Sequence, residues 1–138
     1  EVDGVKYYND SIASSPTRTA LGTLSLYSRK ICIIAGGYDK HIPYEPLGPV
    51  INDKVKLLIL LGDTAPKIEK AVKEASNYDA DEIEIVNVTN MEEAVAVARE
   101  RSTKGDIVSL SPASASFGLY KNFEERGNHF KSIVNALK

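Results

Sequence analysis

Three short polar stretches hold the side chains that could bind an anion. They are residues 9–16 (NDSIASSP), 36–40 (GGYDK) and 111–121 (SPASASFGLYK). Each stretch is rich in glycine or in small and hydroxyl-bearing residues, and the second adds the ammonium group of Lys40. Small residues let backbone N–H groups approach a ligand closely, and a flexible cation suits a carboxylate or a phosphate. The pattern therefore indicates a site for an anionic ligand.

Each stretch also has an ordinary structural interpretation. Asp10 can cap a helix or close a turn, and Ser14 is equally suited to a cap. Lys40 can be a solvated surface lysine. Residues 111–121 can form a crossover loop before a terminal helix with nothing bound, and Phe123 can belong to the core or to the helix entry.

Strands that alternate with helices must position these stretches. Apolar and β-branched runs predict strands, and helical spacing of apolar residues predicts helices. The predicted strands are 5–9, 30–35, 55–61, 83–86 and 107–110, and the predicted helices are about 16–27, 44–51, 65–76, 90–101 and 123–137. This order predicts an α/β fold with a Rossmann-like, doubly wound, mostly parallel sheet and helices on both faces. Parallel strands end at one edge, so the three polar stretches can lie along one rim.

Composition restricts the class of protein. With 138 residues, 43% of them hydrophobic, the chain is one domain with a core of its own. A net charge of −2 predicts neither a nucleic-acid nor a membrane-surface partner. Cys32 lies in an apolar run and is predicted to be a buried strand residue. There is no apolar stretch of spanning length and no leader pattern, which predicts a cytoplasmic protein, and the start without Met suggests a piece of a longer one.

Several common chemistries lack their motifs. The chain contains no GxxxxGK[ST] phosphate loop, no GxGxxG fingerprint and no GxSxG serine. His41 and His129 lack metal-ligand spacing, so no metal site is predicted. We assign a structural role to the turn at residues 62–64 (GDT), and we predict that residues 124–126 (EER) form a solvated, salt-bridged face of the last helix.

Three longer motifs contain the polar stretches: NDSIASSPTRT, IIAGGYDK and SLSPASASFGLYKNFEERGNHF. In this order and spacing they resemble the Mur ligases of peptidoglycan synthesis, in particular the branch that adds D-glutamate to UDP-N-acetylmuramoyl-L-alanine. The resemblance implies that residues 1–138 are the third, C-terminal domain of a three-domain ligase. It implies that the first domain binds the UDP-sugar substrate, and that the central domain holds ATP and Mg2+ with a phosphate loop and a modified lysine.

The resemblance also implies roles for single residues. D-glutamate would be bound by Ser14, Lys40, Ser116, Phe117 and the segment around Phe123, and Asp10 would lie on the nucleotide side of the cleft. No catalytic residue is expected in this chain, and the isolated domain is expected to be inactive. Two positions depart from the family: Ile12 stands where some members carry Lys, which puts a lysine contact to the nucleotide in doubt, and Ser114 stands where some carry Cys.

Two other classes of protein compete with this interpretation. One is a free-standing Rossmann-like module that binds a small ligand or a nucleotide, and the other is a non-catalytic interaction domain. The missing GxGxxG fingerprint argues against the dinucleotide-binding form of the first class. The start without Met argues against both.

Overall fold

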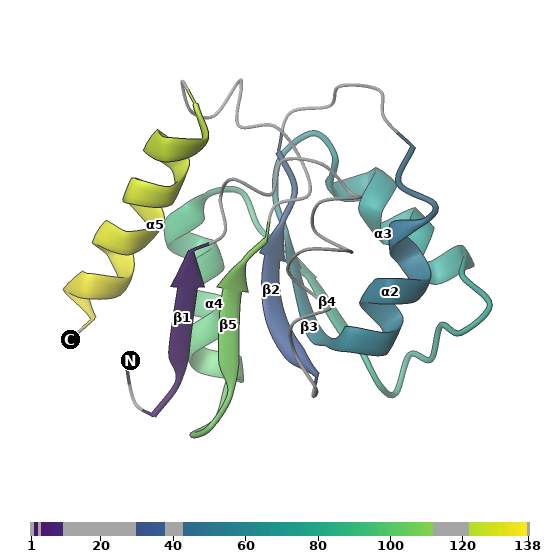
Figure 1. Cartoon of the computed structure of the whole chain (residues 1–138), viewed down its shortest axis with the longest axis horizontal. Helices are drawn as coiled ribbons and strands as arrows, with labels where there is room; N and C mark the ends of the chain where they lie inside the picture. The colour runs from purple at the N-terminus through teal and green to yellow at the C-terminus, as the bar shows by residue number, and fades with distance from the viewer. Residues whose placement is uncertain (1, 3, 10–29, 38–42, 112–121, 138) are drawn as a thin grey trace.

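The computed structural model describes residues 2, 4–9, 30–37, 43–111 and 122–137. A five-stranded sheet in the order β1-β5-β2-β3-β4 forms its centre, and all its strand pairs are parallel (Figure 1). The strands are β1 (Lys6–Asn9), β2 (Ile31–Ala35), β3 (Val55–Leu60), β4 (Glu84–Asn87) and β5 (Ile107–Leu110). The helices are α2 (Leu47–Lys54), α3 (Ala65–Glu74), α4 (Met91–Arg101) and α5 (Phe123–Ala136). The predicted α/β fold is confirmed.

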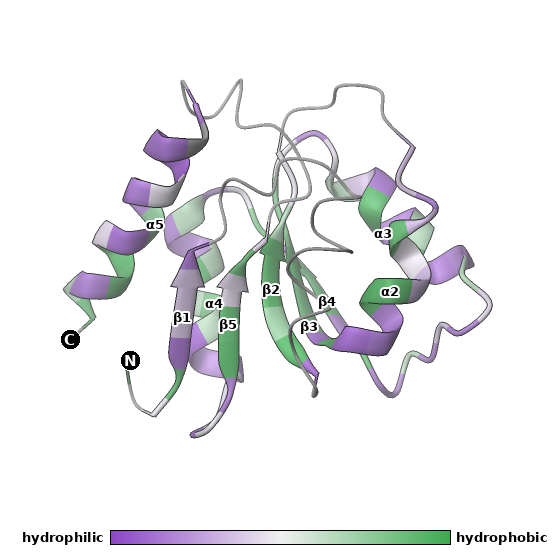
Figure 2. Cartoon of the chain, viewed as in Figure 1, coloured by the Kyte–Doolittle hydropathy of each residue, from purple (hydrophilic) through white to green (hydrophobic). Residues whose placement is uncertain are grey.

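The core lies on both faces of the sheet. Successive residues of β2 point to opposite faces, so Ile33 packs with Ile68 of α3 and the rest of the α2 side, while Ile34 packs with Met91 of α4 and Phe130 of α5. Every residue of β2 is buried, as its unbroken apolar run predicts. Figure 2 shows the same distribution, with β2 and β5 mostly hydrophobic and β1, at the edge of the sheet, mostly hydrophilic.

Most predicted elements agree with the structure to within a few residues, and the strand at 107–110 agrees at both ends. The predicted helix 16–27 lies outside the described residues. The predicted end of the helix before Asn52 was wrong, since α2 continues to Lys54 and runs directly into β3. Asn52 is buried, and its side-chain amide donates to the Val72 carbonyl at 3.0 Å and to the Asn77 Oδ1 at 3.1 Å. Asn52, although asparagine is common in turns, therefore links α2 to α3 and does not end the helix.

Asparagine residues begin the two helices on the α4 side. The Asn90 side chain accepts the Glu93 backbone N–H at 2.8 Å, and the Asn122 side chain accepts the Glu125 N–H at the same distance. Each bond satisfies one of the backbone donors that a helix start leaves open. The second cap fixes where α5 begins, directly after the stretch 111–121.

The first turns of α5 correct one prediction. Glu124 and Glu125 are exposed, but Arg126 is only 3% exposed and does not belong to a solvated face. Arg126, Phe130 and Val134 are spaced by four residues and are all buried. Helical periodicity places them on one face, so the position of Arg126 follows from its spacing and not from its charge.

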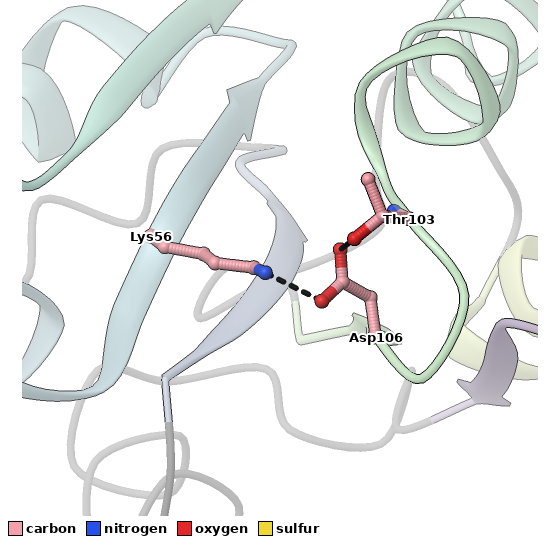
Figure 3. A network of polar contacts seen from close by, with 3 residues as sticks. All are labelled: Lys56, Thr103 and Asp106. Atoms are coloured by element: carbon pink, nitrogen blue, oxygen red, sulfur yellow. Dashed lines mark hydrogen bonds and ion pairs between the residues drawn. The ribbon is translucent and has the colours of Figure 1, made fainter.

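A polar network ties the opposite, amino-terminal edge of the sheet together (Figure 3). The Lys56 ammonium donates to the Asp106 carboxylate at 2.5 Å, and that carboxylate also accepts the Thr103 backbone N–H at 2.8 Å. Lys56 belongs to β3 and Asp106 precedes β5, so the pair reaches across β2. The register of β2 with β3 shifts between Ile31 and Cys32, and an extra residue in a strand re-aims its neighbours. The extra residue in β3 is Lys56, and the shift directs its side chain across β2 toward Asp106.

Cys32 is fully buried in β2, as predicted, and burial raises the pKa of its thiol to about 11. The thiol is therefore uncharged at neutral pH and acts as a small apolar group.

Among the described helices, none has both the length and the apolar character that crossing a bilayer requires.

Candidate ligand-binding site

The residues predicted to hold the ligand fall in or beside the stretches that follow β1, β2 and β5. Asp10, Ser14, Lys40, Ser116 and Phe117 lie outside the described residues, and Phe123 is the first residue of α5. Their convergence in one cleft remains a prediction. The structure does place the strand ends from which these stretches leave.

Those strand ends are neighbours. In the sheet, β5 lies between β1 and β2, and Leu110 at its end is aligned with Asn9 of β1 and with Ile34 of β2. The next residue, Ser111, donates its backbone N–H to the Ile34 carbonyl at 3.0 Å. The three polar stretches therefore begin side by side at the carboxyl edge of the sheet, although Ser111 lies 102 positions after Asn9 in the sequence.

The helices that follow β5 and β2 lie on opposite faces of the sheet. After β2 the chain continues to α2, which packs on one face, and after β5 it continues to α5, which packs on the other (Figure 1). In α/β proteins, ligands bind at the carboxyl ends of adjacent parallel strands whose connections diverge in this way. The stretches with Lys40 and Ser116 follow these two strands, so the strand ends are the expected place for a ligand site.

The serine-rich stretch begins from a buried pair of serine side chains at the end of β5. Ser109 and Ser111 are both fully buried, and their hydroxyl oxygens lie 2.8 Å apart. A buried hydroxyl that finds a partner costs little, and it fixes the side chains that carry it. Sequence reasoning missed this pair, although the i, i+2 spacing of two serines on a strand would place both on one face.

The start of α5 lies against the end of β1. A Cβ atom placed on Gly127 would come within 2.6 Å of the Asn9 side-chain amide, so a larger residue at 127 would have to displace the Asn9 side chain. The Tyr7 and Phe130 rings continue the contact, with their centroids 6.5 Å apart. The helix that follows the serine-rich stretch is thereby held next to the strand that precedes residues 10–29.

The sequence of the chain matches the model of one known protein family. The sequence model of the family described as "Mur ligase, glutamate ligase domain" matches residues 1–114. The chain belongs to the Mur ligase family. This confirms the family resemblance that the three sequence motifs carry.

Relatives of this Mur ligase domain carry names within the same family. A UDP-N-acetylmuramoylalanine–D-glutamate ligase of Acetivibrio thermocellus is 57% identical over 140 residues, which cover 100% of this chain and 30% of that protein. An enzyme of the same name from Clostridium botulinum strain Okra is 58% identical over 137 residues, which cover 99% of this chain and 30% of that protein. The chain thus spans about 30% of the length of these relatives.

A solved structure has the same fold. It is a domain assigned to a UDP-N-acetylmuramate:L-alanyl-gamma-D-glutamyl-diaminopimelate ligase of Haemophilus ducreyi. It aligns with a TM-score of 0.60 at 11% sequence identity and covers 99% of this chain and 90% of that one. At this identity the likeness concerns the fold of the Mur ligase domain alone.

The Mur ligase domain has a groove away from the ends of β1, β5 and β2. It has a volume of about 550 Å³ and lies between the segment before α2 and the helix α3. Its lining is Pro43, Tyr44, Glu45, Pro49, Lys67, Lys70, Ala71, Glu74 and Ala75. None of these residues belongs to the three polar stretches, so the strand ends and not this groove define the candidate site.

The described part of the chain contains no group of three His, Cys, Asp or Glu side chains placed to hold a metal ion. His129 of α5 instead contacts Glu92 of α4, with Nε2 2.8 Å from the carboxylate oxygen. This contact joins the two helices on one face of the sheet.

Proposed function

We propose that the chain is the C-terminal, D-glutamate-binding domain of a ligase that joins D-glutamate to UDP-N-acetylmuramoyl-L-alanine with hydrolysis of ATP. This activity would serve peptidoglycan synthesis, and with it cell-wall growth, cell shape and cell division. The observation that carries the proposal is the position of the three family motifs, which leave from the adjacent ends of β1, β5 and β2. The names of relatives that are 57–58% identical over the whole chain support it.

The residue types of the proposed site suit the ligand. D-glutamate carries two carboxylates and one amine. The Lys40 ammonium can hold one carboxylate in a charge-assisted bond, and the hydroxyls of Ser14 and Ser116, with backbone N–H groups, can hold the other. Phe117 and the segment around Phe123 would shape the wall of the site. Acidic groups are absent from this set, which leaves the amine free to attack.

The proposed reaction is amide formation. ATP phosphorylates the carboxylate of the nucleotide-linked alanine and leaves as ADP. The unprotonated D-glutamate nitrogen then forms a bond to that carbonyl carbon, phosphate leaves, and the nitrogen gives up a proton to solvent. Holding a bound amine against an activated carbonyl can lower the barrier by about 7 to 11 kcal/mol in favourable systems. Positioning is therefore the contribution of this domain, and no residue of it is assigned the role of general base.

ATP and Mg2+ would be bound mainly by the part of the ligase outside this chain. The sequence lacks a phosphate loop, and the described residues provide no cluster of metal-ligating side chains. Asp10 would face the nucleotide side of the cleft. ATP and the nucleotide-linked substrate place the ligase in the cytoplasm.

The experiment is substrate-dependent phosphate release by the full-length ligase. With ATP and UDP-N-acetylmuramoyl-L-alanine present, release should require D-glutamate and should not occur with L-glutamate or with diaminopimelate. The isolated chain of residues 1–138 should release no phosphate with any of them. Release that depends on another amino acid, or ligation by the isolated chain, would overturn the proposed function.

A further inference from the structure

The groove between the segment before α2 and the helix α3 has the dimensions of a small-molecule site. Its volume of about 550 Å³ lies within the range of roughly 300 to 1,000 Å³ that is usual for sites of drug-sized ligands. One wall is a single face of α3, since residues 67, 70, 71, 74 and the cap residue 75 are spaced by three and four. The other wall consists of Pro43, Tyr44, Glu45 and Pro49. A groove of this size can hold one small organic molecule.

Contacts between α2 and α3 keep the groove open. A Cβ atom on Gly48 would lie 2.1 Å from the Ala71 carbonyl oxygen, so the two helix backbones already touch there. The Asn77 side-chain amide donates to the Pro49 carbonyl at 2.9 Å and opposes their separation. The small side chains of Ala71 and Ala75 leave the space between the walls unfilled. The groove is therefore formed before a ligand enters, which lowers the entropic cost of binding.

Two lysines on the α3 wall favour an anionic ligand. Lys67 and Lys70 are exposed and stand three residues apart on one helix face, so both ammonium groups can reach one anion. The Lys70 ammonium lies 4.0 Å from the Glu74 carboxylate, and both side chains are largely exposed. Such a surface ion pair contributes little, so a ligand can replace it. The two carboxylates, Glu45 and Glu74, belong to different walls and do not share a helix face.

We propose that this groove is a second ligand site, which binds a small organic acid with an apolar ring. The ring would lie on the apolar surface of Pro49, Ala71 and Ala75, and its carboxylate, sulfonate or phosphate group would be held by Lys67 and Lys70. None of these residues belongs to the three polar stretches, so the site does not depend on the proposed function.

The test uses anilinonaphthalene sulfonate as the probe, because it joins an aromatic ring system to one anionic group. Titrated into the isotope-labelled chain, it should bind saturably with a Kd on the order of 10 to 100 μM. In NMR spectra it should shift the amide signals of the groove residues more than signals elsewhere. Phenylnaphthylamine, which has the same ring system without the sulfonate, should bind at least about tenfold more weakly.

Two variants separate the charged part of the site from its apolar part. Lys67→Gln combined with Lys70→Gln removes both ammonium groups at exposed positions, and it should weaken sulfonate binding at least about tenfold while leaving phenylnaphthylamine binding within about twofold. Ala75→Leu should fill part of the groove and weaken the binding of both probes by about tenfold.

Lys104→Gln combined with Lys131→Gln is the matched control. It makes the same change in net charge at exposed positions outside the groove, and it should leave both affinities unchanged. An equal loss of sulfonate binding in this control would overturn the proposal, because net charge alone would then explain the attraction. Unchanged sulfonate affinity in the Lys67 and Lys70 double variant would also overturn it. So would NMR shifts confined to residues outside the groove, or the absence of saturable binding.

Discussion

Replacing Asp106 by asparagine is expected to lower the free energy of unfolding of the domain by about 1 to 2 kcal/mol at pH 7. The carboxylate is only 13% exposed and accepts hydrogen bonds from Lys56 and Thr103. Asparagine keeps the shape and an oxygen for Thr103 but loses the charge that holds the ammonium. Lys56 is 40% exposed, so water replaces part of the lost bond and the loss stays below that of a fully buried pair.

The loss should depend on pH. Burial tends to raise the pKa of Asp106, but the hydrogen bonds from Lys56 and Thr103 outweigh it and lower the pKa below its usual value. A carboxyl group with a lowered folded-state pKa stabilises the fold above its unfolded pKa of about 3.9, and this contribution disappears as the pH falls through the folded value. The stability difference between wild type and Asp106→Asn should therefore be complete at pH 7 and shrink below about pH 4.

Urea unfolding of the chain, followed by circular dichroism at pH 7 and pH 3, measures this difference. Asp81→Asn, an exposed position, is the control and should change stability by less than about 0.5 kcal/mol. Combining Asp106→Asn with Lys56→Met should give a coupling energy of about 0.5 to 1.5 kcal/mol. Equal stability of wild type and Asp106→Asn at pH 7, or a deficit that is unchanged at pH 3, would refute the reasoning.

Three further predictions concern single residues. Gly36→Ala should destabilise the domain by more than about 3 kcal/mol, because the new Cβ atom meets the Leu61 carbonyl; a urea midpoint near that of wild type would contradict this. Asn122→Ala should cost about 1 kcal/mol through loss of the α5 cap, whereas Asn135→Ala, on the exposed side of the same helix, should cost less; equal losses would remove the role of the cap. With a pKa of about 11 and full burial, Cys32 should resist alkylation at pH 8 in the folded chain and react in urea, so fast alkylation of the folded chain would contradict its placement.

The sequence predicts the strands well because burial on both faces leaves a simple pattern. The apolar run of β2 and residues 57–60 of β3 are too short and too uniformly apolar to form one face of a helix, and a glycine follows each strand within two residues. Local patterns fail where a tertiary contact decides. Asn52 is typical of a helix stop, but its side-chain amide donates to the Val72 carbonyl of α3. Arg126 is typical of a surface charge, but it lies on the buried stripe of α5.

The candidate site could be predicted only in part. The residue types of the three polar stretches indicate an anion, and parallel strands place them on one edge. Their adjacency depends on β5 lying between β1 and β2, and no local pattern encodes this order. The contact between Thr64 and Gly37 joins residues 27 apart, and it depends on the pairing of β2 with β3. Such contacts become visible only when the sheet is assembled.

Steady-state kinetics of Lys40→Ala in the full-length ligase, with each substrate varied in turn, test whether this domain binds D-glutamate. Loss of a charged partner of a carboxylate in a partly desolvated cleft should lower kcat/KM for D-glutamate about ten- to a hundredfold, corresponding to about 1.5 to 3 kcal/mol. Ser116→Ala should lower it less, and Lys40→Arg should restore it only in part, because a planar guanidinium approaches a carboxylate differently. The KM values for ATP and for the UDP-sugar substrate should not change. An unchanged kcat/KM for D-glutamate in Lys40→Ala would contradict the assignment of this domain as the D-glutamate site.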